Sequence, residues 1–177
     1  LTPVTVAIWD SGVDTAIFGG QLWTNAAETA DGVDNDGNGY VDDVHGIAFD
    51  VKSARTPDLL VPLDDPLRAA YPQMRNFTKG LLDLQASIDS VEASDLKRHL
   101  ASLQPADVKG FIEQLNFFGN FTHGTHVAGI AAAGNPAARL MAVRITFDHR
   151  LIPDVPTREQ SEKDAQAARD VIAYLQA

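Results

Sequence analysis

The sequence feature that most constrains the fold is an apolar, β-rich run at residues 4–9 that stops abruptly at Asp10-Ser11-Gly12. An uncharged run of this kind is typical of a buried strand in a parallel sheet. Two further strand candidates follow, at 46–49 and 139–145, and apolar residues at helical spacing predict a helix over 158–175. This alternation predicts an α/β fold with a parallel sheet and flanking helices. In such sheets the chemistry lies beyond the carboxyl ends of the strands, which is where Asp10 stands.

The second informative stretch is His123-Gly124-Thr125-His126-Val127-Ala128-Gly129. Small residues continue to 133 and Gly134-Asn135-Pro136 follows, so the pattern predicts a helix over 123–133 with His123 at its start. The helix dipole disfavours an imidazolium ion at that end, so a histidine acting there as a general base needs a carboxylate partner. Asp10 can supply it, and by accepting a hydrogen bond it would fix the ring tautomer. Asp10 and His123 are thus candidates for two members of an Asp-His-Ser triad.

The segment 51–118 between these stretches has a different pattern. Apolar residues recur at three- and four-residue spacing in successive blocks, which predicts three amphipathic helices. The first block is Met74, Phe77, Leu81, Leu84 and Ile88; the second is Leu96, Leu100 and Leu103 behind Ser94 as N-cap; the third follows Pro105. We expect a compact, all-helical insertion, which serves either as a structural elaboration or as a lid or docking surface beside the site.

Composition excludes several classes of function. The formal net charge is −10 and the pI is near 4.7, whereas nucleic acids and anionic membranes select a basic face. The longest run of small apolar residues, 127–133, is far too short to span a bilayer. The chain has no cysteine, so disulfides, thiolate metal sites and a cysteine nucleophile are absent.

An Asp- and Gly-rich stretch at 34–45 predicts a calcium site. Oxygen-bearing residues alternate along it as in an EF-hand-type loop, with Gly39 at the sharp turn. The candidate ligands are Asp34, Asp36, Asn38, the Tyr40 carbonyl, Asp42 and Asp43. The twelfth position is His45 rather than Glu, so the closing bidentate ligand is either missing or supplied by Asp43. The alternative is a turn that needs no ion, because Asp, Asn and Gly favour turns in any case.

Together these stretches resemble the subtilisin-like serine peptidases, the subtilases. Residues 6–14, Val-Ala-Ile-Trp-Asp-Ser-Gly-Val-Asp, are similar to the Asp block of that family, and 123–130, His-Gly-Thr-His-Val-Ala-Gly-Ile, to its His block. The loop from Leu22 through Glu28 to Asp43 and the strand at 138–144 also resemble the family. The resemblance implies that 1–50 and 119–177 form the amino-terminal half of a subtilase catalytic domain, a partial subtilisin-like sheet that 51–118 interrupts.

The resemblance also implies roles for individual residues. Asp10 would orient and stabilise the imidazole, His123 would act as the general base, and His126 would face the interior of the protein. A competing interpretation places His45, His123 and His126 around zinc, because His-x-x-His has the spacing for one helical face. A third ligand beside that histidine pair is not identified from the sequence, and the intervening Gly-Thr fits the peptidase better.

The chain departs from the family in its serines. They stand at positions 11, 53, 87, 90, 94, 102 and 161, and none lies in a Gly-Thr-Ser context. We therefore expect the nucleophile to lie in a carboxy-terminal half of the domain outside this chain, and the chain alone to be inactive. The expected partners are a polypeptide substrate, that missing half and, through an exposed sheet edge, a second copy. The alternative is an inactive calcium-binding, protein-interaction fragment. An incomplete calcium ligand set suits high calcium concentrations, and the resemblance to the subtilases implies export, so both favour a secreted or cell-envelope location.

Overall fold

The computed structural model describes residues 2–176 and divides them into two compact units. The first comprises the chain up to Val61, Phe121–Phe147 and the segment from Asp154 onward. The second comprises Pro62–Asn120 and Asp148–Pro153. The sequence placed these divisions at 50/51 and 118/119, and it gave no sign that 148–153 belongs with the second unit.

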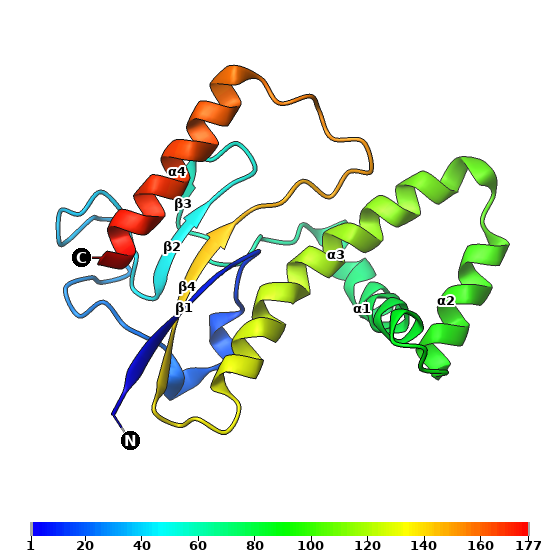
Figure 1. The fold of residues 1–177 in the computed structure, drawn as a ribbon, viewed down its shortest axis with the longest axis horizontal. Helices are drawn as coiled ribbons and strands as arrows, with labels where there is room; N and C mark the ends of the chain where they lie inside the picture. The colour runs from blue at the N-terminus through cyan, green and yellow to red at the C-terminus, as the bar shows by residue number, and fades with distance from the viewer. Residues whose placement is uncertain (1, 177) are drawn as a thin grey trace. The chain divides into compact units, whose positions relative to one another are not determined.

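The first unit is built on a four-stranded sheet in the order β1-β4-β2-β3 (Figure 1). Its strands are β1 (Val4–Asp10), β2 (Gly46–Phe49), β3 (Arg55–Thr56) and β4 (Ala138–Ile145). β4 pairs in parallel with both β1 and β2, whereas the two-residue β3 pairs antiparallel with β2. The predicted α/β fold is confirmed. The sheet is mixed rather than wholly parallel, because β3 is too short to leave a sequence pattern.

Helices cover the two faces of this sheet. On one face Met141 and Val143 of β4 pack with Ala167 and Val171 of helix α4 (Arg158–Gln176). On the other, Leu140 and Ala142 pack with Ala128, which belongs to the later part of helix α3 (Pro105–Ala132). Alternate β4 residues therefore serve opposite layers, and β4 is the buried centre of the sheet. The sequence pattern predicts Ala165, Ala168, Val171, Ile172 and Leu175 as the core positions of α4. Val171 is confirmed, but the stripe that packs on the sheet runs through Ala167, Val171 and the partly buried Tyr174.

The expectation that β1 is a buried strand was wrong. β1 has β4 as its single neighbour and forms one edge of the sheet. Ile8 is its one buried residue, while Val4 and Trp9 are 54% and 41% exposed. The apolar composition of β1 follows from β-propensity and one covered face, and composition alone does not distinguish an edge strand from a central one.

The helix that carries His123 is longer than its sequence pattern suggests. α3 runs without a break from Pro105 to Ala132, so His123 lies in the interior of the helix and not at its start. No proline stands between Pro105 and Pro136, and Gly119 costs a helix only about 1 kcal/mol relative to alanine. The helix dipole therefore does not act on His123 in the way that a position at the helix start would imply. Only the carboxyl end was placed correctly, since Gly134 adopts a left-handed φ of 70° just after the helix.

The second unit is all-helical in its main part, as predicted. It contains α1 (Asp65–Gln85), α2 (Val91–Ser102) and residues 105–120 of α3. Its buried side chains are Met74, Phe77, Ala93, Leu96, Phe111, Leu115 and Phe118. The N-cap of α2 is Ser90, whose hydroxyl accepts a hydrogen bond from the Ala93 amide, and not the predicted Ser94. Among residues 2–176 no helix combines the length and apolarity needed to cross a bilayer.

Candidate functional site

The structure brings Asp10 and His123 together although 113 residues separate them. Asp10 is the last residue of β1, and His123 faces it from α3. The Nδ1 atom of His123 lies 2.8 Å from Oδ1 of Asp10 and 3.0 Å from Oδ2. The Asp10 side chain is 16% exposed, whereas the imidazole is 62% exposed and accessible to a reactant.

Ser11 holds the Asp10 carboxylate in place. Its backbone amide and its hydroxyl both donate to Oδ1 of Asp10, at 2.6 and 2.9 Å. The same hydroxyl oxygen accepts a hydrogen bond from the Gly124 amide at 3.2 Å, so it links the carboxylate to α3. Partial burial alone would raise the pKa of Asp10, but the hydrogen bonds from His123 and Ser11 outweigh it and hold that pKa below its ordinary value. Asp10 is therefore a carboxylate around neutral pH.

Two glycines allow the helix to approach the strand end this closely. Gly12 has a φ of +122°, which permits the chain to turn immediately after β1. A Cβ atom on Gly124 would lie 2.3 Å from the Gly12 carbonyl oxygen, so no larger residue fits there without movement. The Thr125 hydroxyl adds a further link, because it accepts a hydrogen bond from the Asp14 amide at 2.9 Å. The geometry of the pair therefore depends on backbone contacts as well as on the two side chains.

This arrangement equips His123 as a base. Because the carboxylate can only accept, Nδ1 carries the proton, and Nε2 is left as the basic nitrogen. Within residues 2–176, the hydrogen bonds of the His123 ring are those of Nδ1 to Asp10, and none involves Nε2. Ser11, the one serine nearby in sequence, is 4% exposed and is bonded to Asp10 instead. The pair can take a proton from an incoming hydroxyl but holds no nucleophile of its own.

Arg144 is a further residue of this region that the sequence did not single out. It pairs with Asp10 in the β1–β4 register and is 3% exposed. Its Nε and Nη1 atoms are buried without a hydrogen-bond partner among the described residues. Burial lowers the pKa of the guanidinium, and the carboxylates of Asp58 and Asp50 oppose that effect. Its Cδ atom would lie 3.1 Å from a Cβ on Gly12, so Arg144 packs directly beneath the Asp10 turn.

The Asp-rich loop is organised by its own carboxylates. The Asp34 carboxylate accepts hydrogen bonds from the backbone amides of Gly37, Asn38 and Gly39. Asp36 accepts from the side-chain amides of Asn25 and Asn38, and the hydrogen bond from Asn25 is the main cause that lowers the pKa of Asp36. These bonds fold the loop into successive turns, as Asp and Asn side chains do when they bond to nearby backbone.

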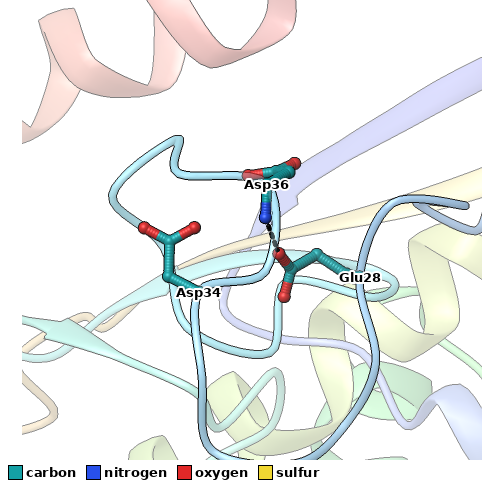
Figure 2. Close-up of side chains that lie close together, drawn as sticks. All are labelled: Glu28, Asp34 and Asp36. Carbon is teal, nitrogen blue, oxygen red and sulfur yellow. Dashed lines mark hydrogen bonds between the residues drawn. The ribbon is translucent and has the colours of Figure 1, made fainter.

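One group of acidic side chains in the loop has metal-ligand geometry. Glu28, Asp34 and Asp36 each present a carboxylate oxygen, and these oxygens all lie within 4.8 Å of one another (Figure 2). Glu28 is 7% exposed, and its Oε1 accepts hydrogen bonds from the amides of Asn35 and Asp36. Its Oε2 is buried with no partner among residues 2–176. A buried carboxylate oxygen needs a donor or a cation, so the group is a candidate site for a metal ion.

The other predicted ligands make different contacts. The Asn38 amide donates to Asp36 and Asp43, and Asp43, itself 2% exposed, also accepts from Asn25. Asp42 accepts from the amides of Asp31 and Gly32. Tyr40 packs in the core with Phe49. Glu28 escaped the sequence-based ligand set because it precedes the EF-hand-like stretch and no ligand spacing includes it.

The histidines do not gather around a common point. Nδ1 of His45 donates to the Trp23 carbonyl at 2.9 Å, and His123 is bonded to Asp10. His126 is exposed rather than facing the interior as expected. In the described part of the chain these three histidines do not form a group with metal-ligand distances, and the zinc interpretation has no support. Comparisons with protein families, curated proteins and solved structures found no match to this chain.

Proposed function

We propose that this chain supplies the acid and the base of a subtilisin-like serine endopeptidase. The observation that carries the proposal is the contact between Asp10 and the Nδ1 atom of His123, with the Nε2 edge of an exposed ring left available. An orienting carboxylate on one ring nitrogen and a basic second nitrogen are the two features that a triad histidine needs. The resemblance of both sequence blocks to the subtilases supports the assignment of the reaction.

In this proposal each residue has one task. His123 takes the proton from a serine hydroxyl as that hydroxyl attacks a peptide carbonyl, and it later returns the proton to the leaving amine. Asp10 keeps the ring in the productive tautomer and stabilises the imidazolium while it exists. Ser11 and Gly124 hold Asp10 and the helix in register, so the ring needs no reorientation during the reaction.

The nucleophile comes from outside the described residues in this proposal, which makes a sharp test possible. Losing the serine of a triad costs roughly a million-fold in turnover, so the isolated chain should take no label from a fluorophosphonate. A longer polypeptide that contains both this chain and the serine should be labelled. In that polypeptide His123→Ala should abolish labelling, while His126→Ala should leave it intact. Labelling of the isolated chain, or equal labelling of both variants, would overturn the proposal.

A second candidate function is calcium binding at Glu28, Asp34 and Asp36. The specific observation in its favour is the buried and unpartnered Oε2 atom of Glu28. Calcium accepts carboxylate oxygens in flexible geometry and would supply the positive charge that this oxygen lacks. The ion would then tie Glu28 to the following turns and stabilise the fold, without taking part in the chemistry at Asp10 and His123.

The expected partners remain proposals and centre on β1. This strand has a free edge, and an unpaired edge with apolar side chains is a template for another strand. The serine-bearing half of the domain is the occupant that the peptidase proposal requires, and a second copy is the alternative. Sedimentation of the purified chain over a range of concentrations tests the second copy, because self-pairing raises the mean mass as the concentration rises.

A further inference from the structure

A cavity of about 750 Å³ lies in the first unit, apart from the Asp10–His123 pair. It is lined by residues of β1, β4, α4 and the Asp-rich loop, and its most distinctive walls are the aromatic rings of Trp23, Tyr40 and Tyr174. The volume is in the range of small-ligand sites in proteins. Neither the proposed peptidase chemistry nor the acidic group around Glu28 accounts for the aromatic part of this cavity.

The three rings meet edge to face. The Trp23 and Tyr174 centroids are 6.5 Å apart with the planes at 79°, and those of Tyr40 and Tyr174 are 5.2 Å apart at 70°. In an edge-to-face pair one ring covers only part of its partner's face, and all three of these residues line the cavity. Aromatic walls of this kind attract cations, because the face of each ring is electron-rich.

The charges around the rings have the matching sign. The Asp36 and Asp170 carboxylates line the cavity, and Asp43 lies close enough to Tyr174 to influence it. Arg55 is the single cationic side chain among the lining residues that the structure describes. The balance of charge at the cavity is therefore negative, which favours a cationic ligand over an anionic or neutral one.

Arg55 shows which cation these walls suit. Its guanidinium lies 4.1 Å from the Tyr40 ring centroid, donates to the Gly39 carbonyl, and forms an ion pair with Asp170 at 3.1 Å. One wall of the cavity is thus already covered by a planar guanidinium, with a ring beneath it and a carboxylate at its edge. Trp23, Tyr174 and Asp36 offer the same combination without an internal cation.

The Tyr174 hydroxyl can accept a further hydrogen bond. Its oxygen is buried and accepts none among residues 2–176, while its proton faces the Asp43 carboxylate. Burial first, and then the interaction with Asp43 as a hydrogen-bond acceptor, raise the pKa of this hydroxyl, so it stays protonated. A guanidinium bound against Trp23 would place an N–H donor where the hydroxyl oxygen can accept it.

We propose that this cavity binds the guanidinium group of a ligand, held against the aromatic wall of Trp23 and Tyr174 with Asp36 as counter-charge. The site is separate from the peptidase chemistry, because it uses neither Asp10 nor His123, but it shares Asp36 with the proposed calcium site. The guanidinium belongs either to a free guanidine or to an arginine side chain of a polypeptide. The two sources share the recognition chemistry and differ in the backbone that the larger part of the cavity would have to accommodate.

The test is a calorimetric titration of the chain with three probes, in calcium and again in EGTA. N-acetylarginine amide should bind saturably and about ten-fold more tightly than N-acetylcitrulline amide, its neutral isostere. Agmatine then separates the sources: binding equal to that of the arginine amide assigns a free guanidine, and weaker binding assigns a peptide-borne arginine. A preference below three-fold for the cation in both buffers, or no saturable binding of either amide, would overturn the proposal.

Variants locate the binding. Trp23→Leu should weaken it about ten-fold, while Trp9→Leu, which changes the other tryptophan of the chain outside the cavity, should leave it unchanged. Tyr174→Phe keeps the ring and removes only the hydroxyl, and we expect roughly five-fold weaker binding. Unchanged affinity in Tyr174→Phe would overturn the assignment even if Trp23→Leu does not fold, and circular dichroism of each variant checks the fold.

Discussion

The Asp10–His123 pair and the Asp-rich loop are two concentrations of polar groups in the same unit, and they are built in opposite ways. The pair joins a strand end to a helix 113 residues later and depends on close backbone contact at Gly12 and Gly124. The loop is local: its carboxylates bond to amides a few residues away, and Gly37 has open space around it. The pair is therefore sensitive to packing, while the loop is sensitive to what neutralises its charge.

Solvent exposure follows the same contrast. At the pair, the group that would react is the exposed one, and the buried atoms of Asp10 and Ser11 are fully bonded. In the loop most carboxylates are exposed and bonded, and the one orphan atom, Oε2 of Glu28, is buried. The buried atoms of the pair thus have their hydrogen bonds and its reactive group faces solvent, whereas the loop has a buried oxygen without a hydrogen bond.

Gly124→Ala should be the most damaging single change. The new Cβ would meet the Gly12 carbonyl oxygen at 2.3 Å, and overpacking against backbone costs about 3 kcal/mol. The melting temperature should fall by roughly 6–12 °C, measured by thermal unfolding. Gly129→Ala on the same helix is the matched control. No atom lies within 4 Å of its Cβ position, so this change should leave stability unchanged or raise it. Equal losses in the two variants would contradict the close-approach explanation.

Calcium should have the next largest effect, and it should act on the loop. At a concentration a hundred times the dissociation constant, binding adds about 2.7 kcal/mol, which is roughly 5–10 °C in melting temperature relative to EGTA. Glu28→Gln removes the orphan carboxylate charge and should cut this shift by more than half. Glu162→Gln, an exposed position on α4, should leave the shift unchanged. A full shift in Glu28→Gln would place the ion elsewhere.

Asp10→Asn should have the smallest effect on stability, and the effect should depend on pH. The folded protein holds the pKa of Asp10 below the ordinary value of 3.8, so the charged group stabilises the fold above that pH. The contribution is below about 1 kcal/mol for a pair with an exposed partner, and it is lost as pH falls through the depressed pKa. Denaturant unfolding from pH 2.5 to 6 should show the wild type and Asp10→Asn converging at the acid end. A constant difference would mean that the carboxylate charge is not responsible.

A double-mutant cycle measures the coupling between the Asp10 and His123 side chains. Combining Asp10→Asn with His123→Ala should give less than the sum of the single effects, with a coupling below about 1 kcal/mol. Additive effects would mean that the hydrogen bond between the two side chains contributes nothing in solution.

Local patterns predicted the elements of the first unit well, because propensity and periodicity act over a few residues. The strands near 46–49 and 139–145, the helix starting at Arg158 and the carboxyl end of α3 all lie where the sequence indicated. The placement of Asp10 and His123 at one end of the sheet also followed from two short stretches, because strand ends and small residues carry strong local signals.

What the sequence could not reveal was decided by tertiary packing. β1 is an edge strand because of the strand order, and its apolar composition gives no sign of that position. The continuity of α3 through Gly119 depends on contacts that outweigh a weak local preference for a break. Glu28 and Arg144 are notable because their charged side chains are buried, and the sequence pattern does not indicate the burial of a charged residue. The calcium prediction, made from spacing alone, therefore missed the one carboxylate with an unsatisfied atom.

The free edge of β1 makes ionic strength the variable that governs how the chain behaves at high concentration. Along residues 4–9 the edge carries no charged side chain to repel an approaching strand, so local repulsion is weak. The net charge of −10 repels whole molecules instead. That repulsion extends only over about 8 Å at physiological salt and about 3 Å at 1 M. Added salt therefore removes the barrier that dilute buffer maintains, and colloidal stability should fall with salt well before the fold itself is affected.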